Sequence, residues 1–267
     1  MTVKSRSSSI SVIIPTCDRE DKLKKTIKSV LNQTFRPKEI ILVNNGKKKL
    51  KKNLINNKNI KIRIYNIRPY IGPAIARNKG AKMSTSEFLA FLDDDDTWPK
   101  NYLKTFDAYR KKNYSDCYSF KVVGVDGKKK FLYKNPKGKV FLEYLFQRSP
   151  GIGCSNIIVR KKIFNEGINF DNSLVPSEDK GFVIDLILKK KKISVINKSH
   201  IYYSLSNDDD RLSRVENILN GKVAILKKYY YVMSFYTKIK LMITILKIYL
   251  KIFFTKKLEI NLWNKKF

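Results

Sequence analysis

Four consecutive aspartates, residues 93–96, are the group in this sequence with the clearest capacity for chemistry. They follow the apolar run 88–92, and four adjacent carboxylates repel one another unless a cation lies among them. Because side chains of an extended segment alternate between two faces, Asp93 and Asp95 are expected to share one face and bind one ion. Carboxylates of this kind suit Mg²⁺ or Mn²⁺ carrying substrate phosphates. The alternative is a solvated acidic turn, which the cationic surroundings disfavour.

A second acidic pair, Glu178 and Asp179, stands where a helix over about 179–189 is expected to begin. Carboxylates are favoured at a helix N-terminus by the helix dipole, so the pair alone does not indicate a function.

The elements that must position these carboxylates alternate through the first hundred residues. Strands are expected at 10–14, 40–43, 60–65 and 88–92, the first ended by Pro15. Helices are expected after Asp18, which is placed to cap the first, and from Gly72-Pro73 through Met83. Single helices between strands indicate a mostly parallel sheet with helices on both faces. Ligands of such sheets bind beyond the carboxyl ends of the strands, so loops 15–19, 44–48 and 93–97 are expected to converge on one edge.

The second half of the chain is more mixed. Strands are expected at 118–123, 156–159 and 193–197, with a basic, turn-rich hairpin at 124–138. Beyond about residue 213, Lys240, Thr244, Lys247 and Lys251 fall on one helical stripe among apolar residues. No apolar stretch reaches the ~20 residues of a spanning helix. Two interpretations stay open: a helix in the interface of a membrane, and a helix packed on its own domain with its lysines outward.

Composition narrows the class of protein. The 267 residues are 43% hydrophobic, which excludes wholesale disorder, and carry a formal net charge of +33, which attracts polyanions. Cys17, Cys117 and Cys154 form no CxxC pair, so neither a disulfide framework nor a zinc site is indicated. The polar residues 1–9 are expected to be a disordered tail and no signal peptide.

Four segments in order give a specific resemblance: residues 11–19 (SVIIPTCDR), 29–34 (SVLNQT), 72–80 (GPAIARNKG) with 91–98 (FLDDDDTW), and 151–160 (GIGCSNIIVR) with the later Glu178-Asp179. The chain resembles the family-2 glycosyltransferases, which have the α/β GT-A fold, a Rossmann-like, mostly parallel central sheet with helices on both faces. The resemblance implies a catalytic domain at 10–212, with a nucleotide-binding half at 10–98 and an acceptor half at 99–212. A C-terminal basic amphipathic helical region would occupy 213–267.

The resemblance also implies roles for individual residues. Asp95 would be the principal ligand of Mn²⁺ or Mg²⁺, assisted by Asp93, with Asp96 supporting the loop. Asp179 would be the general base of an inverting transfer, with Glu178 beside it. The donor nucleotide-sugar would be bound by Pro15, Cys17, Arg19, Asn45, Arg77, Asp93 and Asp94.

The chain departs from the family pattern at three places, two of which concern the nucleotide. The family usually has Tyr, stacked on the base, where this chain has Cys17, and an Asp that accepts a hydrogen bond from uracil where it has Asn45. The Asn45 amide can accept and donate, so uracil recognition stays open. Lys47 is expected to meet phosphate or to face solvent. Ser204 and Ser206 stand where many members carry Arg and His, and His200 is expected to be structural.

These features predict an enzyme that moves a sugar from a UDP-sugar to a glycan or lipid-linked acceptor in bacterial surface polysaccharide or lipooligosaccharide synthesis. We expect it in the cytoplasm, peripheral on the inner face of the cell membrane and attracted to anionic lipid. The alternatives are a basic module that binds nucleic acid or anionic surfaces, a sugar-phosphate nucleotidyltransferase, and an inactive glycosyltransferase-like scaffold. No nucleic-acid-binding motif is visible, so no nucleic-acid partner is expected.

Overall fold

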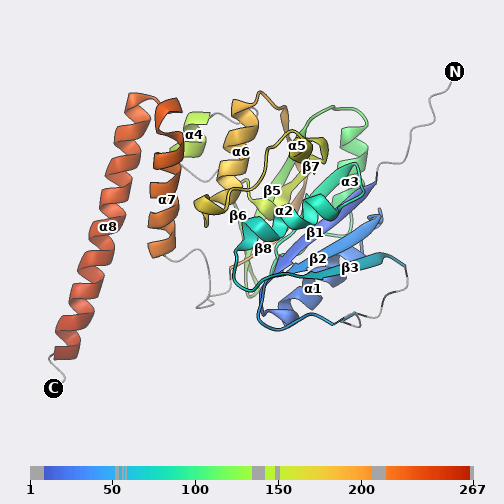
Figure 1. The fold of residues 1–267 in the computed structure, drawn as a ribbon, viewed down its shortest axis with the longest axis horizontal. Helices are drawn as coiled ribbons and strands as arrows, with labels where there is room; N and C mark the ends of the chain where they lie inside the picture. Colours follow the sequence, from blue (N-terminus) through green and yellow to red (C-terminus); the bar gives the residue numbers. More distant parts are fainter. Residues whose placement is uncertain are drawn as a thin grey trace.

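A computed structural model describes residues 9–51, 54, 55, 57, 59–133, 142–147, 151–205 and 215–264, with side chains of the last helix described to Thr255. Figure 1 shows one sheet with helices on both faces and a pair of helices alongside. In chain order the elements are β1 Ile10–Thr16, α1 Glu20–Leu31, β2 Glu39–Asn44, β3 Lys61–Asn66, α2 Pro73–Met83, β4 Phe88–Phe91, α3 Tyr102–Arg110, β5 Cys117–Asp126, β6 Lys129–Leu132, α4 Leu142–Gln147, η1 Cys154–Asn156, β7 Ile157–Arg160, α5 Lys162–Asn165, η2 Asn172–Leu174, α6 Glu178–Leu188, β8 Ile193–Ser204, α7 Val215–Tyr229, η3 Tyr230–Val232 and α8 Phe235–Asn264.

The sheet has the strand order β3-β2-β1-β4-β7-β5-β6, and β8 pairs with β5 outside this path. Strands β3, β2, β1 and β4 are parallel neighbours, as is the β5–β8 pair, whereas β7 is antiparallel to β4 and β5. This is the expected mostly parallel α/β sheet, and β3, β2, β1 and β4 all point their carboxyl ends the same way.

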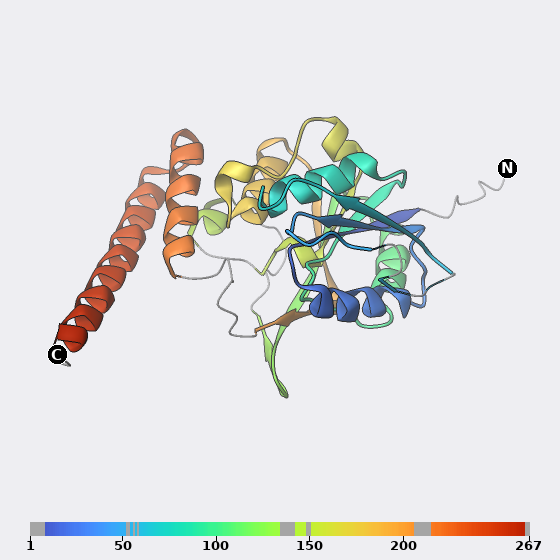
Figure 2. The ribbon, with the colours of Figure 1, turned by 60° about the horizontal axis from the view of Figure 1, so that its bottom comes forward.

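Side chains of β1 point alternately to the two faces of the sheet, and each face has its own hydrophobic core. Ile13 packs with α2 and α6 on one face, whereas Val12 and Ile14 pack with α1 and α3 on the other. Figure 2 shows α1 and α2 on opposite faces of the sheet. A strand buried on both faces reads as a continuous apolar run, which is why β1 and β2 were recognisable in the sequence.

Two local expectations were wrong. Pro15 does not end β1, which continues to Thr16. In a strand, the backbone groups of residues two apart point toward the same neighbouring strand, so those of Pro15 point toward β4, as those of Ile13 do. The β1–β4 pairing ends at Ile13, so the sheet loses no hydrogen bond because Pro15 has no N–H. Asp18 does not cap α1, because it has a φ of 53° and the cap position is Arg19. The Asp18 carboxylate is used instead by loop 44–48.

The C-terminal helices α7 and α8 pack on the domain through one side. Ile225, Tyr229, Met233 and Leu241 belong to the core that α6 also builds, and Tyr229 donates to the Gly181 carbonyl at 3.1 Å. Figure 1 shows α8 projecting past the domain. Its outer side exposes large apolar side chains: Ile239, Met242, Ile243, Leu246, Tyr249, Leu250, Phe253 and Phe254. Within the described part of the chain, no helix has the length and apolar content needed to span a bilayer.

Candidate active site

The three loops expected at one edge of the sheet do meet there. The Asp18 carboxylate accepts hydrogen bonds from the backbone N–H groups of Lys47 and Lys48, both at 2.9 Å. The Thr16 hydroxyl donates to Asp94 Oδ2 at 2.6 Å. Loop 15–19 is therefore bonded to both of its neighbours, and the carboxyl ends of β1, β2 and β4 form one site.

The aspartates alternate in burial, but the extended backbone expected for them was wrong: residues 94 and 95 form a turn, in which the Asp96 backbone N–H donates to the Asp93 carbonyl at 3.2 Å. Asp94 and Asp96 are buried, whereas the side chains of Asp93 and Asp95 keep 31% and 14% of their exposure. Arg19 pairs with Asp94 at 2.9 Å and with Asp95 at 3.1 Å. Burial raises the pKa of Asp94 to about 6, against the opposing effects of Arg19 and Thr16. Asp94 thus lies behind Arg19, and the two aspartates open to the site are those expected to bind an ion.

Asp96 is the innermost member of the cluster. Its Oδ1 accepts from the Ser204 backbone N–H at 3.0 Å, and burial together with the charges of Asp95 and Asp93 raises its pKa well above the usual range. This bond ties the cluster to the end of β8, which agrees with the supporting role expected for Asp96.

Arg77 joins the two acidic groups that the sequence places far apart. This buried side chain of α2 binds Asp93 Oδ1 at 2.6 Å through one nitrogen and Glu178 Oε1 at 2.8 Å through another. Glu178 is itself buried, and its Oε2 has no hydrogen-bond partner among the described residues. Arg77 was expected near the nucleotide. That stays a prediction. The Arg77 guanidinium lies between the two carboxylates, so the acidic loop and the start of α6 face each other.

Asp179 is partly buried next to this bridge. Burial and the neighbouring charge of Glu178 raise its pKa to about 7. Asp179 Oδ1 accepts from the Lys180 backbone N–H at 2.6 Å, and a Cβ placed on Gly153 would lie 3.4 Å from Oδ2. A carboxyl group with a pKa raised to about 7 is suited to accept a proton.

One residue that holds the site together, Ser155, was missed in the sequence. The Ser155 hydroxyl accepts from the Asp93 backbone N–H at 3.0 Å, and its carbonyl accepts from Trp98 Nε1 at 3.0 Å. Segment 154–156 therefore clamps the acidic loop from the acceptor side. The segment lies in a recognised motif, but nothing in one sequence distinguishes a clamping serine from an exposed one.

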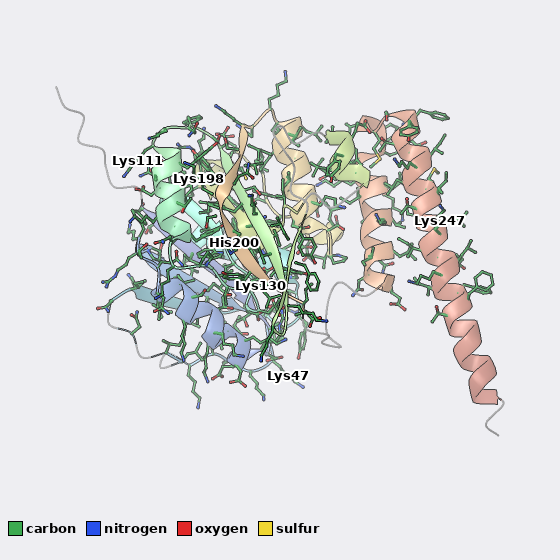
Figure 3. All side chains as sticks on the ribbon, turned by 180° about the vertical axis from the view of Figure 1, so that it is seen from behind. Lys47, Lys111, Lys130, Lys198, His200 and Lys247 are labelled. Atoms are coloured by element: carbon green, nitrogen blue, oxygen red, sulfur yellow. The ribbon has the colours of Figure 1, made fainter. Side chains whose placement is uncertain are left out.

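The nucleotide side contains an aromatic ring that was also missed. Tyr70 is 65% exposed, its hydroxyl donates to Asp18 at 3.0 Å, and its backbone N–H donates to the Asn45 carbonyl at 2.7 Å. Cys17 contacts the same carbonyl through its thiol at 3.7 Å, and Asn45 is buried. Lys47 is exposed at the rim of the loop, as Figure 3 shows.

The fit of the site to a divalent cation rests on Asp93 and Asp95. Among the described residues, no group of three or more Asp, Glu, His or Cys side chains is arranged to hold a metal. One or two carboxylates completed by substrate phosphates are, however, the usual surroundings of Mg²⁺. Asp93 and Asp95 are the partly exposed carboxylates that could contribute to such a donor set, and each also pairs with an arginine, Arg77 and Arg19.

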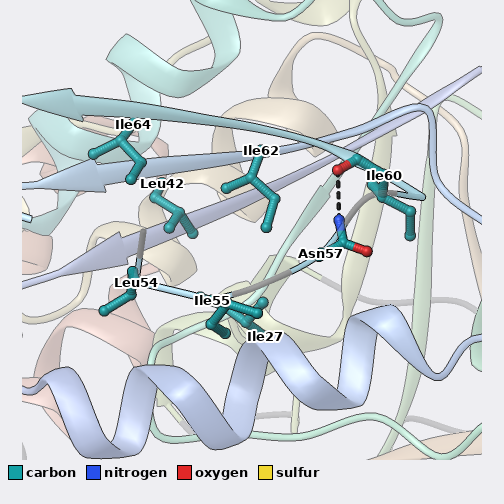
Figure 4. Close-up of a pocket in the computed structure, with 8 residues that line it drawn as sticks. All are labelled: Ile27, Leu42, Leu54, Ile55, Asn57, Ile60, Ile62 and Ile64. Carbon is teal, nitrogen blue, oxygen red and sulfur yellow. Dashed lines mark hydrogen bonds between the residues drawn. The ribbon is translucent and has the colours of Figure 1, made fainter. Parts of the chain in front are cut away.

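Two pockets differ in chemical character. One of about 590 Å³ opens beside Asp95 and is lined by Asp95, Thr97, Val125, Asp126, Gly127, Lys130, Tyr202 and Ser204. The other, about 140 Å³, lies between α1 and the β2–β3 edge and is apolar apart from Asn57, whose amide is bonded to the Ile60 carbonyl (Figure 4). Only the first adjoins groups that could bind a charged substrate.

Known proteins are similar to this chain in sequence and in fold. The family model described as glycosyl transferase family 2 matches residues 11–168. The chain is 33% identical over 208 residues to the Staphylococcus aureus poly(ribitol-phosphate) beta-N-acetylglucosaminyltransferase TarP, covering 74% of this chain and 63% of TarP. It is 27% identical to an Escherichia coli UDP-Glc:alpha-D-GlcNAc-diphosphoundecaprenol beta-1,3-glucosyltransferase, covering 70% of this chain and 73% of that enzyme.

Solved structures show the same fold. The crystal structure of S. aureus TarS residues 1–349 in complex with UDP-GlcNAc superposes with a TM-score of 0.65 at 24% identity, covering 82% of this chain and 66% of that one. A Bacillus spizizenii poly(ribitol-phosphate) beta-glucosyltransferase is 27% identical over 76% of this chain but only 33% of its own length. This chain thus spans less than two thirds of the length of TarP and of the B. spizizenii enzyme.

Proposed function

Because the chain belongs to glycosyl transferase family 2, we propose that it transfers a sugar from a UDP-sugar to a hydroxyl group of a glycan or lipid-linked acceptor, with inversion at the anomeric carbon. The observation that supports this most is the Arg77 bridge. It fixes the donor-side Asp93 opposite the start of α6, where Asp179 has the pKa of a general base.

In the proposed reaction Asp179 accepts the proton of the acceptor hydroxyl while that oxygen attacks the sugar from the face opposite the diphosphate. General-base assistance of this kind contributes about 10²–10⁴-fold to the rate. Glu178 is buried beside Asp179 and holds Arg77. Asp95 and Asp93 would hold Mn²⁺ or Mg²⁺, which when bound supplies positive charge to the departing diphosphate.

For the donor, we propose that the nucleobase lies over Asn45 and Cys17, with the Tyr70 ring beside it. The ring is exposed and is bonded to the loops that carry both residues. The choice of a UDP-sugar is supported by relatives: TarS structures contain UDP-GlcNAc or UDP, and the E. coli relative is described as using UDP-Glc.

For the acceptor and setting, we propose bacterial surface-polymer synthesis at the inner face of the cell membrane. Relatives are described as acting on poly(ribitol-phosphate) or on a diphosphoundecaprenol-linked sugar. The apolar outer side of α8 is interspersed with exposed Lys240, Lys247 and Lys251, which suits an anionic membrane surface. Each lysine near such a surface contributes about 1 kcal/mol.

A thermal-shift panel tests the donor assignment. UDP-, GDP-, CMP- and dTDP-sugars would be compared with and without Mn²⁺. A ligand at 100 times its dissociation constant stabilises the folded state by about 2.7 kcal/mol. We expect UDP-sugars with Mn²⁺ to raise the melting temperature most. A larger shift with another nucleotide would reject the UDP assignment, and no shift with any would reject the transferase function.

A further inference from the structure

Helix α7 contacts α6 on both sides of the turn that carries Asp179. Figure 1 shows α7 between α6 and α8. The first contact is at Gly221, where a Cβ added to the backbone would lie 2.5 Å from Ser177 Oγ and 3.3 Å from Pro176 Cδ. Ser177 directly precedes α6. The backbone of α7 therefore approaches the start of α6 so closely that only glycine fits without a shift of Ser177.

The second contact is made by Tyr229, at the end of α7. Its side chain is buried, and its hydroxyl oxygen lies 3.1 Å from the Gly181 carbonyl oxygen and 2.8 Å from Asp185 Oδ1, so its one proton is shared between two acceptors on α6. A Cβ added to Gly181 would lie 3.3 Å from this hydroxyl oxygen and 2.2 Å from Leu174 Cδ1. Helix α7 is thus bonded to α6 at the end of its first turn.

Two ion pairs next to Tyr229 hold the same helices together. Lys228 Nζ lies 3.1 Å from Asp185 Oδ2 on α6 and 3.0 Å from Asp171 Oδ2, directly before η2. All three side chains are partly buried, so salt screens these pairs less than it screens exposed ones. A shift of α7 along α6 would therefore break the neutral and the charged contacts together.

The Asp179 carboxylate depends on this packing because few contacts hold its own side chain. Asp179 Oδ1 accepts from the backbone N–H of the next residue, Lys180, and among the described residues no side chain donates a hydrogen bond to this carboxylate. Glu178, by contrast, is held by Arg77 at 2.8 Å. The position of Asp179 thus follows the backbone of residues 177–181, which α7 contacts at either end.

We propose that Gly221 and Tyr229 are positioning residues, through which α7 holds the first turn of α6 where Asp179 reaches the acceptor hydroxyl. The inference rests on the proposed function, in which Asp179 is the general base. A base must come within about 2.6–3.2 Å of the oxygen whose proton it accepts, and a misplacement of about 1 Å can lower the rate about 10²-fold. Helix α7 thus belongs to the catalytic unit, in addition to carrying α8.

The test compares Tyr229→Phe with Tyr230→Phe, which removes the same hydroxyl from the next, exposed residue. The full chain would hydrolyse UDP-GlcNAc, with water as the acceptor, at a temperature at which every variant is folded. We expect Tyr229→Phe to lower kcat at least tenfold and to change KM less than twofold, because the donor loops 15–19 and 44–48 are bonded to each other. Tyr230→Phe should match the parent. A parental kcat in Tyr229→Phe, or a KM that rises as much as kcat falls, would overturn the proposal.

A second pair of variants tests the close approach at Gly221. Gly221→Ala would place a methyl group 2.5 Å from Ser177 Oγ, although alanine favours a helix more than glycine does. It should lower kcat, and adding Ser177→Ala, which removes that oxygen, should return kcat to within threefold of the parent. A loss of kcat that Ser177→Ala leaves unchanged would overturn the role of Gly221.

Two further measurements separate positioning from general stability. Amide hydrogen exchange of segment 176–184 should become faster in Tyr229→Phe, whereas β1 and β2 should exchange as in the parent. Faster exchange throughout the chain would indicate a structural role alone and overturn the proposal. The pH at which kcat is half-maximal should also fall, because a displaced Asp179 is less buried and its pKa is raised less.

Failure of the positioning role and failure of the proposed function give different results. Hydrogen exchange needs no turnover, so it reports the contact of α7 with α6 whatever the reaction is. If Asp179→Asn hydrolyses the UDP-sugar as fast as the parent, the base assignment fails and the positioning role fails with it. If Asp179→Asn is slow but Tyr229→Phe is as fast as the parent, only the positioning role fails.

Discussion

Asp93 and Glu178 are held on opposite sides of one guanidinium, that of Arg77, at 2.6 and 2.8 Å. One lies in the loop after β4 and the other begins α6, so the bridge joins the nucleotide-side and acceptor-side halves of the sheet. It also places Asp179, the next residue of α6, beside the acidic loop. The two acidic groups, far apart in the sequence, are therefore brought to either side of one buried side chain, and a cleft that they share stays a prediction.

Removing the bridge should destabilise the protein strongly. Arg77→Met would leave Glu178 buried without its cation, and breaking a buried pair costs about 3–5 kcal/mol. Arg77→Lys should recover part of this loss, because one ammonium cannot reproduce both contacts. Urea unfolding would measure the change in the free energy of unfolding. Lys24→Ala, which breaks the exposed Glu20 pair, is the control and should change nothing measurable. An Arg77→Met protein within 1 kcal/mol of the parent would show that the bridge is not a stabilising contact.

The raised pKa of Asp179 predicts a pH dependence of transfer. Only the ionised carboxylate accepts a proton, so kcat should rise with pH below about 7 and level off above it. Because the folded pKa is raised from 3.8, the folded state favours protonated Asp179. Its contribution to stability is thus present at acid pH and lost as pH rises through about 7. Asp179→Asn should remove both the rise of kcat with pH and the loss of stability near pH 7. An unchanged acid limb in that variant would assign the titration to another group.

Much of the fold could be predicted because the buried strands have a simple pattern. Continuous apolar runs identified β1, β2 and β4, and the rule that ligands bind at carboxyl ends of parallel strands brought their loops together. Asp18 escaped prediction for a physical reason. A capping aspartate and one that binds a neighbouring loop look the same in sequence, and only the φ of 53° separates them.

The chemistry of the site was less accessible from sequence than its position. Asp93 and Asp95 are separated from the buried Asp94 and Asp96 as expected, but the cause is a turn at residues 94–95 and not an extended segment. The partners of these carboxylates depend on contacts between distant segments, such as Arg77 with Glu178, and a single sequence does not reveal those. Tyr70 was missed because it lies in an irregular loop, where no periodicity marks it.

The metal assignment predicts that substituting Asp95 weakens UDP binding, whereas substituting another acidic residue nearby does not. Asp95→Ala should weaken Mn²⁺-dependent UDP binding at least tenfold in calorimetry, because the ion loses its principal ligand. Asp126→Ala is the matched control, since Asp126 lines the same pocket outside the cluster, and it should bind UDP as the parent does. Equal Mn²⁺ dependence in the Asp95 variant would exclude this residue as a ligand.

The exposed side of α8 predicts association with anionic vesicles. Phe253→Ser with Phe254→Ser should reduce flotation with phosphatidylserine liposomes, because both rings are more than half exposed and available to lipid. The signal should also fall as salt rises, since lysines contribute electrostatically. Leu188→Ser, at an exposed apolar position on α6, is the control. If flotation changes neither with salt nor with the α8 substitutions, membrane binding through this helix is rejected.

The most direct test of the central claim is the anomeric configuration of the sugar released when water replaces the acceptor. Proton NMR would follow a UDP-α-linked hexose with Mn²⁺ during the first minutes, before mutarotation. A single displacement assisted by Asp179 predicts that the β anomer appears first, and that Asp179→Asn slows its release by about 10²–10⁴-fold. Initial release of the α anomer, or a variant as fast as the parent, would contradict the account.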